Sequence, residues 1–225
     1  MAKLHVLRVF TDADGAWGNP LGVFLDGAEV PAERRQEVAT ELGFSETVFV
    51  DDRESGACRI FTPGSELGFA GHPSVGTAWL LAREGRRVEA LRPPAGEVVV
   101  RFEGDLTFIA TRADWSPPWE MIELGSAAEV EALDGPPGGR EDEIYLWAWA
   151  DEAAGRVRSR CFALEDGVGE DEATGSAALM LVTELDRPLT IRQGRGSVLD
   201  ARPLGDGRAA VGGRVALDET RDFSV

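Results

Sequence analysis

Three side chains that can take or give a proton stand beside short apolar runs, and their types favour acid–base chemistry on a small molecule. The first, Glu46, opens the apolar run 47–50. A carboxylate at the mouth of a buried strand is partly desolvated. Desolvation favours the neutral acid, which suits a group that both accepts and donates a proton. The alternative is an ordinary exposed glutamate at a strand start, because most glutamates in proteins face solvent.

Histidine is scarce, and the sequence contains only His5 and His72. His5 lies in an alternating run that predicts a strand, which favours a structural or surface role. His72 stands between Gly71 and Pro73, just before a predicted helix. In that position its side chain can face a cleft or act as a structural cap, and functional residues concentrate in such loops.

Asp171 lies in an acidic segment, 170–172, before a third predicted helix. Runs of charge usually mark a solvated face, so position alone leaves both a solvated loop and a site residue open. The segment is not a phosphate-binding loop, because acids occupy it and no lysine follows Gly175. A catalytic serine has weak support, because neither Ser45 nor Ser176 lies in a nucleophile elbow.

The two cysteines, Cys58 and Cys161, are far apart in sequence, and each lies in an apolar, strand-like run. This pattern favours buried, unreactive thiols. The sequence has no paired cysteines and no Cys/His cluster with metal-ligand spacing. It therefore predicts no metal site.

Alternating and apolar runs predict the elements that must position these side chains. The predicted helices are 31–42, 74–83 and 176–185, and Gly43 ends the first of them. The predicted strands are 4–10, 21–25, 46–50, 58–62, 97–102, 106–111, 144–150, 156–164, 188–193, 196–204 and 208–211.

The order of elements repeats: strands, a polar glycine-containing loop, one apolar helix, then more strands. A tryptophan- and proline-rich connector, 115–119, places a boundary near residue 113 and predicts domains 1–112 and 113–225. Helix N-termini entered by polar glycine loops favour a bound carboxylate, because their unpaired N–H groups and dipole attract anions.

Charge and hydropathy limit the partners. The chain has 225 residues and a formal net charge of -17, so nucleic acid and anionic membranes would repel it. No apolar run approaches a membrane span of ~20 residues, and the first ten residues do not form an apolar leader. The expected location is the cytoplasm.

Several motifs in order resemble the PhzF-like proteins, the family of the phenazine-biosynthesis isomerase, which share the diaminopimelate-epimerase fold. The matching segments are Gly18-Asn19-Pro20, Gly43-Phe44-Ser45-Glu46-Thr47-Val48-Phe49, Ile60-Phe61-Thr62-Pro63, Glu66-Leu67-Gly68-Phe69-Ala70-Gly71-His72-Pro73 and the loop 171–177. They cover most of the first half and the loop before the third helix. An ordered set of this kind is far more specific than any one of its members.

The resemblance implies an α/β chain of two similar domains, each a curled, mostly antiparallel sheet around a central helix, with the site between them. It implies that Glu46 is the general acid/base of an allylic proton shift. It further implies that His72, Asp171 and Ser176 contact a small carboxylate-bearing substrate, with backbone N–H groups from Gly71 and Gly175. No cofactor and a homodimer are also implied.

The sequence departs from the family in two places. Glu172 stands where the family usually has proline, and the stretch between 111 and 145 shows fewer strands than a full-length relative carries. A catalytically inactive small-molecule binding protein on the same fold is therefore the alternative function. A two-thiol racemase is disfavoured, because the two loops that carry cysteines in the epimerases have none here.

Overall fold

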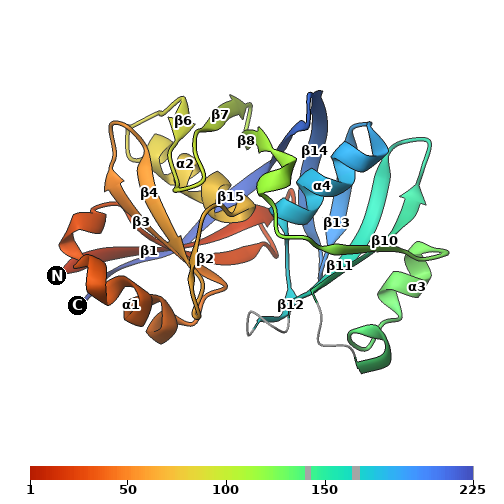
Figure 1. The fold of residues 1–225 in the computed structure, drawn as a ribbon, viewed down its shortest axis with the longest axis horizontal. Coiled ribbons are helices and arrows are strands. Elements are labelled where there is room, and N and C mark those ends of the chain that lie inside the picture. The colour runs from red at the N-terminus through yellow and green to blue at the C-terminus, as the bar shows by residue number, and fades with distance from the viewer. Residues whose placement is uncertain (140–142, 164–167, 225) are drawn as a thin grey trace.

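The strands form one continuous hydrogen-bonded path that curls around two helices, one in each half of the molecule (Figure 1). This architecture is taken from a computed structural model, which describes residues 1–139, 143–163 and 168–224. In chain order the helices are α1 (Arg35–Leu42), α2 (Gly71–Arg83), α3 (Ala127–Glu131) and α4 (Gly175–Leu185). The strands are β1 (Ala2–Thr11), β2 (Asn19–Phe24), β3 (Glu46–Asp52), β4 (Ala57–Phe61), β5 (Glu66–Leu67), β6 (Ala90–Leu91), β7 (Val98–Glu103), β8 (Leu106–Arg112), β9 (Glu120–Glu123), β10 (Ile144–Asp151), β11 (Arg156–Ala163), β12 (Val168–Asp171), β13 (Leu189–Gln193), β14 (Ser197–Gly205) and β15 (Arg208–Phe223).

The first half surrounds α2. Strands β1 to β5 pair in sequence order, and α2 contacts β1, β2 and β3 on one side and β6 to β8 on the other. Ten residues of this 13-residue helix are buried. A helix that is buried on nearly all sides must be small and apolar, which explains its content of alanine, glycine and leucine. Its first turn therefore lies inside the protein, where it can form part of a site.

The second half repeats this arrangement around α4. Strands β10, β11, β13 and β14 pair side by side, and α4 contacts β14 and β15. Three strand pairs among the described residues are parallel, β2 with β3, β9 with β10 and β11 with β13, and the others are antiparallel. The prediction of a mostly antiparallel α/β chain with a helix inside each curled sheet is confirmed.

Strand β15 joins the two halves. Its first part, 208–213, pairs with β8, and its second part, 214–223, pairs with β1. Each half therefore uses strands from the other half of the sequence, and one hydrophobic core runs through both. The domain boundary near residue 113 stays a prediction.

The structure corrects several predicted bounds. Helix α2 begins at Gly71 rather than at residue 74, so His72 and Pro73 lie in its first turn. Proline is tolerated there because first-turn N–H groups have no partner within the helix. The polar loop expected over 165–174 contains β12, and its residues 165–167 lie outside the described residues.

Two further differences lie at the end of the chain and in the connector. The stretch after the connector carries β9 and α3, and Ser126 caps the start of α3: its Oγ accepts from the Glu129 N–H and donates to the Glu129 carboxylate. Strand β15 continues 12 residues beyond the predicted end, because β1 supplies partners for its charged side chains. Arg8 Nε, for example, lies 2.8 Å from Asp218 Oδ2. No helix among the described residues has the length and apolar character that crossing a membrane requires.

Candidate active site

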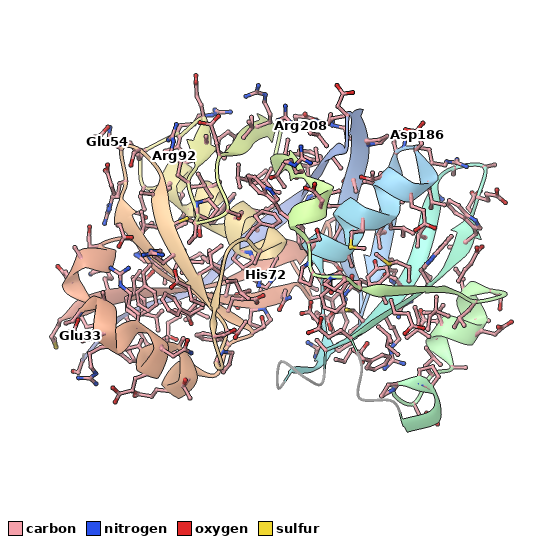
Figure 2. All side chains as sticks on the ribbon, viewed as in Figure 1. Glu33, Glu54, His72, Arg92, Asp186 and Arg208 are labelled. Carbon is pink, nitrogen blue, oxygen red and sulfur yellow. The ribbon has the colours of Figure 1, made fainter. Side chains whose placement is uncertain are left out.

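A pocket lies between the two halves, and all six residues predicted as site residues line it: Glu46, Gly71, His72, Asp171, Gly175 and Ser176. Three come from the first half and three from the second. Figure 2 shows His72 in the middle of the molecule, whereas Glu33, Glu54 and Asp186 lie near its periphery. The pocket has a volume of about 60 Å³, which is room for a few water molecules.

Glu46 is the first residue of β3, and its side chain is 15% exposed at the pocket wall. Its Oε2 atom lies 3.2 Å from Nε2 of His72. Strand β3 runs from this residue into the apolar core, so the carboxyl group sits at the boundary between the core and the pocket. The structure thus places the predicted acid beside the predicted histidine.

His72 is the second residue of α2, and its side chain is 4% exposed. Burial lowers its pKa from 6.5 to about 4, while the charge of Asp171 and a hydrogen bond to the Pro20 carbonyl act in the opposite direction. The ring is therefore neutral near pH 7. At that pH the 3.2 Å contact with Glu46 is therefore not an ion pair.

Asp171 ends β12 and faces the same pocket from the second half. Asn19 Nδ2 donates to its Oδ1 over 2.6 Å, and Thr174 Oγ1 donates to its Oδ2 over 2.6 Å. Burial raises the pKa of Asp171, and so does the nearby Glu46. The His72 ring and the two hydrogen bonds lower it by smaller amounts. Two carboxyl groups and one imidazole thus share a water-poor space, where protonation states are strongly coupled.

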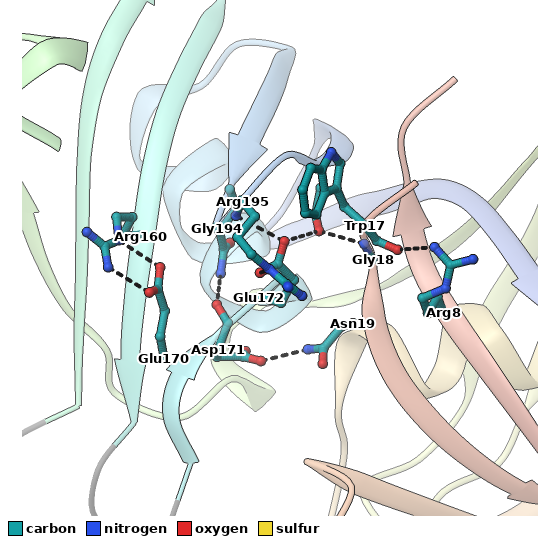
Figure 3. Close-up of polar contacts among 12 residues, drawn as sticks. Arg8, Trp17, Gly18, Asn19, Arg160, Glu170, Asp171, Glu172, Gly194 and Arg195 are labelled. Atoms are coloured by element: carbon teal, nitrogen blue, oxygen red, sulfur yellow. Dashed lines mark hydrogen bonds and ion pairs between the residues drawn. The ribbon is translucent and has the colours of Figure 1, made fainter. Parts of the chain in front are cut away.

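The side-chain amide of Asn19 forms hydrogen bonds with residues of both halves. Besides Asp171, its Nδ2 donates to the Ala173 carbonyl over 2.9 Å, and its Oδ1 accepts from Ser45 Oγ over 3.1 Å. Figure 3 shows the amide reaching across to Asp171. The motif Gly18-Asn19-Pro20 was used in the resemblance, yet no feature of the sequence alone pointed to a bridging amide.

The glycines Gly71 and Gly175 are the first residues of α2 and α4, and their backbones touch. A Cβ atom at Gly71 would lie 2.8 Å from the Cα of Gly175, closer than real Cβ atoms approach backbone. The two helices therefore start at one point on the pocket wall, with their positive dipole ends together. Such a pair of N-termini can hold an anion through backbone N–H groups.

Ser176 and Trp119 form a further contact on the pocket wall. The indole Nε1 of Trp119 donates to Ser176 Oγ over 3.0 Å. Trp119 belongs to the connector just before β9, and no motif in the sequence distinguishes it as a site residue. The tryptophan- and proline-rich composition of the connector is the one sequence feature that could have drawn attention to this residue.

Glu172 does not enter this pocket. Its carboxylate accepts hydrogen bonds from the Arg195 N–H and from Ser197 Oγ, each over 3.0 Å, and it forms an ion pair with the Arg195 guanidinium (Figure 3). Because it points toward the turn between β13 and β14, its charge is neutralised on the outer side of the loop. Glu172, which stands where the family usually has proline, is therefore not among the residues that line this pocket.

The two cysteines are buried, unpaired and not among the pocket residues. Burial raises the pKa of Cys58 to about 12 and that of Cys161 well above its ordinary value. Such thiols are poor nucleophiles. Within the described residues, no group of three or more His, Cys, Asp or Glu side chains is placed to hold a metal ion.

An epimerase-like isomerase is the class that this fold and pocket define, and sequence comparison identifies the family. Residues 7–135 match the family described as phenazine biosynthesis-like protein, PhzC-PhzF, and the chain belongs to that family. A trans-2,3-dihydro-3-hydroxyanthranilate isomerase of Pseudomonas aeruginosa is 34% identical over 218 residues, covering 79% of this chain and 78% of the relative. The isomerase of the same name from Pseudomonas fluorescens is 33% identical over 210 residues, covering 76% and 75%.

Solved structures agree at the level of the fold. A phenazine biosynthesis protein of the PhzF family from Bacillus anthracis superposes with a TM-score of 0.82 at 18% identity, covering 100% of this chain and 99% of the other. The resemblance to PhzF-like proteins is thus confirmed, as is the expectation of an isomerase.

Proposed function

We propose that this chain is an isomerase that moves a proton on a small, unsaturated ring acid without a cofactor, with Glu46 as the general acid/base. One observation carries the proposal. The Glu46 carboxyl group and the N-termini of α2 and α4 line the same pocket between the halves. The named activity of the relatives supports a substrate of the trans-2,3-dihydro-3-hydroxyanthranilate type.

In the proposed reaction, Glu46 removes a proton from a carbon next to a conjugated system and returns it at another carbon. One acid/base suffices when both carbons lie on the same face of the ring. The neutral His72 ring lies 3.2 Å from the Glu46 carboxyl group and places no positive charge beside it near pH 7. In this proposal Glu46 itself carries the proton from one carbon to the other within one turnover.

The substrate carboxylate occupies the start of the two helices in this proposal. Backbone N–H groups at Gly71 and Gly175 point outward from the first turns, where they have no partner within the helix. The dipoles of both helices stabilise the negative charge of the carboxylate and the charge that spreads into the ring when the proton leaves. Ser176 adds a hydroxyl group at the same place.

Deuterium exchange tests the role of Glu46. Wild-type protein in heavy water should incorporate deuterium into trans-2,3-dihydro-3-hydroxyanthranilate or its product, and Glu46→Gln should reduce the rate at least about 100-fold, the usual contribution of a general acid/base. Equal midpoints of thermal unfolding for the two proteins would exclude a folding defect. Exchange at the wild-type rate in Glu46→Gln would rule out this residue as the proton carrier. Tight binding of the compound without exchange by the wild type would instead favour a binding protein.

A further inference from the structure

The side chain of Trp119 has one polar atom, the indole nitrogen, and it forms a hydrogen bond with another residue of the pocket. Its indole Nε1 donates to Ser176 Oγ, and Trp119 is only 8% exposed. An indole N–H can donate but cannot accept, so the serine oxygen must be the acceptor in this bond. The hydroxyl proton of Ser176 is therefore directed to a different acceptor, and both side chains line the pocket.

The connector fixes Ser176 through its main chain as well. Ser116 Oγ donates to the Ser176 carbonyl over 3.0 Å. The connector is anchored on the first half, because the ring of Trp115 packs edge-on against Phe69 with centroids 6.2 Å apart. The connector, 115–119, thus holds Ser176 by both its backbone and its side chain, and Phe69, against which it packs, also lines the pocket.

We propose that Trp119 is a positioning residue that fixes the Ser176 hydroxyl as a donor to the carboxylate of the bound substrate. The proposal rests on the proposed function in one respect, that the ligand is a carboxylate. Ser176 is the second residue of α4, so a hydroxyl held in this rotamer adds one donor to the N–H groups of the first turn. Without the indole, the hydroxyl can rotate among its staggered positions and lose that alignment.

A double-mutant cycle on ligand binding tests this role. The probe is 3-hydroxyanthranilate, an aromatic analogue with a carboxylate and no ring proton on an sp3 carbon, titrated calorimetrically into wild type, Trp119→Phe, Ser176→Ala and the double variant. Trp119→Phe keeps an aromatic wall and removes the donor, so affinity should fall about fivefold. In the Ser176→Ala background the same change should have no further effect, because no hydroxyl remains to be oriented.

Turnover and a remote tryptophan supply the controls. With trans-2,3-dihydro-3-hydroxyanthranilate as substrate, Trp119→Phe should raise KM by the same factor and leave kcat within about twofold, because ground-state and transition-state binding are weakened alike. Trp149→Phe removes an indole from β10 outside the pocket lining and should change neither constant. A folding defect would not produce such a split between KM and kcat.

Several results would overturn the proposal. These are an equal loss of affinity from Trp119→Phe with and without Ser176, an unchanged affinity in Trp119→Phe, or no binding of the probe to the wild type.

If Trp119→Phe does not fold, the indole N–H resonance of Trp119 still provides a test. That resonance should move in Ser176→Ala while the Trp149 resonance stays, and an unmoved Trp119 resonance would contradict the hydrogen bond. The isomerase proposal fails on a different result, deuterium exchange retained in Glu46→Gln, because the cycle measures binding alone.

Discussion

Asn19 Nδ2 and Asp171 Oδ1 are 2.6 Å apart, and this hydrogen bond joins the start of β2 in one half to the end of β12 in the other. Asn19 is 2% exposed, so water cannot replace the bond. Loss of the Asn19 donor would leave Oδ1 of Asp171 without this bond, and only the bond from Thr174 to Oδ2 would remain of the two, so part of the desolvation cost of the carboxyl group would no longer be offset. The Asn19 amide thus links the two halves of the protein at the pocket.

Asn19→Asp keeps the shape of this side chain and removes both N–H donors. We expect the free energy of unfolding to fall by about 2 kcal/mol, because a buried acceptor loses its partner and gains an acidic neighbour. Urea denaturation measures this change, and kcat/KM should fall at least about tenfold. Thr190→Val is the matched control, because it deletes an exposed hydrogen bond to Asp200 and should cost much less. Equal losses in the two variants would contradict the bridging role.

Gly71→Ala tests the contact between the two helix N-termini. The added methyl group would lie 2.8 Å from the Gly175 Cα, so one helix start must move. Overpacking of this kind costs about 1–3 kcal/mol. We also expect the affinity for 3-hydroxyanthranilate to fall, because the N–H groups of both helices shift. Gly64→Ala, at an exposed position where the nearest atom is 3.9 Å away, should change neither quantity. Unchanged affinity in Gly71→Ala would show that the close contact is incidental.

Elements whose formation depends on residues close in sequence could be predicted from the sequence. The helix 31–42 was expected to end at Gly43, and α1 does end there, because Gly43 adopts a φ of 66° that other residues adopt only with strain. The apolar segments 74–83 and 176–185 also predicted helices, which correspond to α2 and α4. Pro73 predicts a helix that begins at residue 74, but α2 begins at Gly71, because the first turn of a helix accepts proline.

Strands and contacts that depend on residues far apart in the sequence could not be predicted from residue patterns. The charged end of β15 shows no clear strand pattern, and only its pairing with β1 makes it a strand. The amide of Asn19 gains its bridging position from a loop 152 residues later in the chain. Glu46, His72 and Asp171 were named through ordered motifs, and spacing alone left each of them open to an ordinary structural interpretation.

Glu172→Gln tests whether the acid in place of the usual proline matters for catalysis. Because the carboxylate faces Arg195 and Ser197 rather than the pocket, kcat/KM should stay within about threefold of wild type. The unfolding free energy should fall by about 1–2 kcal/mol, because a hydrogen bond to a charged group contributes about 1.5–3 kcal/mol and the amide keeps only part of it. A drop in kcat/KM comparable to that of Glu46→Gln would show that Glu172 acts on the substrate.

The buried His72 ring makes stability depend on pH, and the sign follows from its pKa. In the folded protein that pKa is about 4, below the ordinary 6.5, so between these values the unfolded chain binds more protons than the folded one. The contribution of His72 is therefore complete above pH 6.5 and is lost as the pH falls toward 4, by at most about 3 kcal/mol. Asp171 opposes it, because its raised pKa makes the folded state bind a proton first.

Urea denaturation of wild type and His72→Gln at several pH values between 7 and 4 checks this dependence. The wild-type unfolding free energy should fall faster on acidification than that of His72→Gln, because the variant has no ring that is kept neutral by burial. His5 supplies the control. Burial also lowers its pKa, but it lies outside the pocket beside Thr220. His5→Gln should therefore keep most of the steepness below pH 6.5. Parallel curves for wild type and His72→Gln would contradict the lowered pKa, because they would mean that the His72 ring binds protons equally in the folded and the unfolded chain.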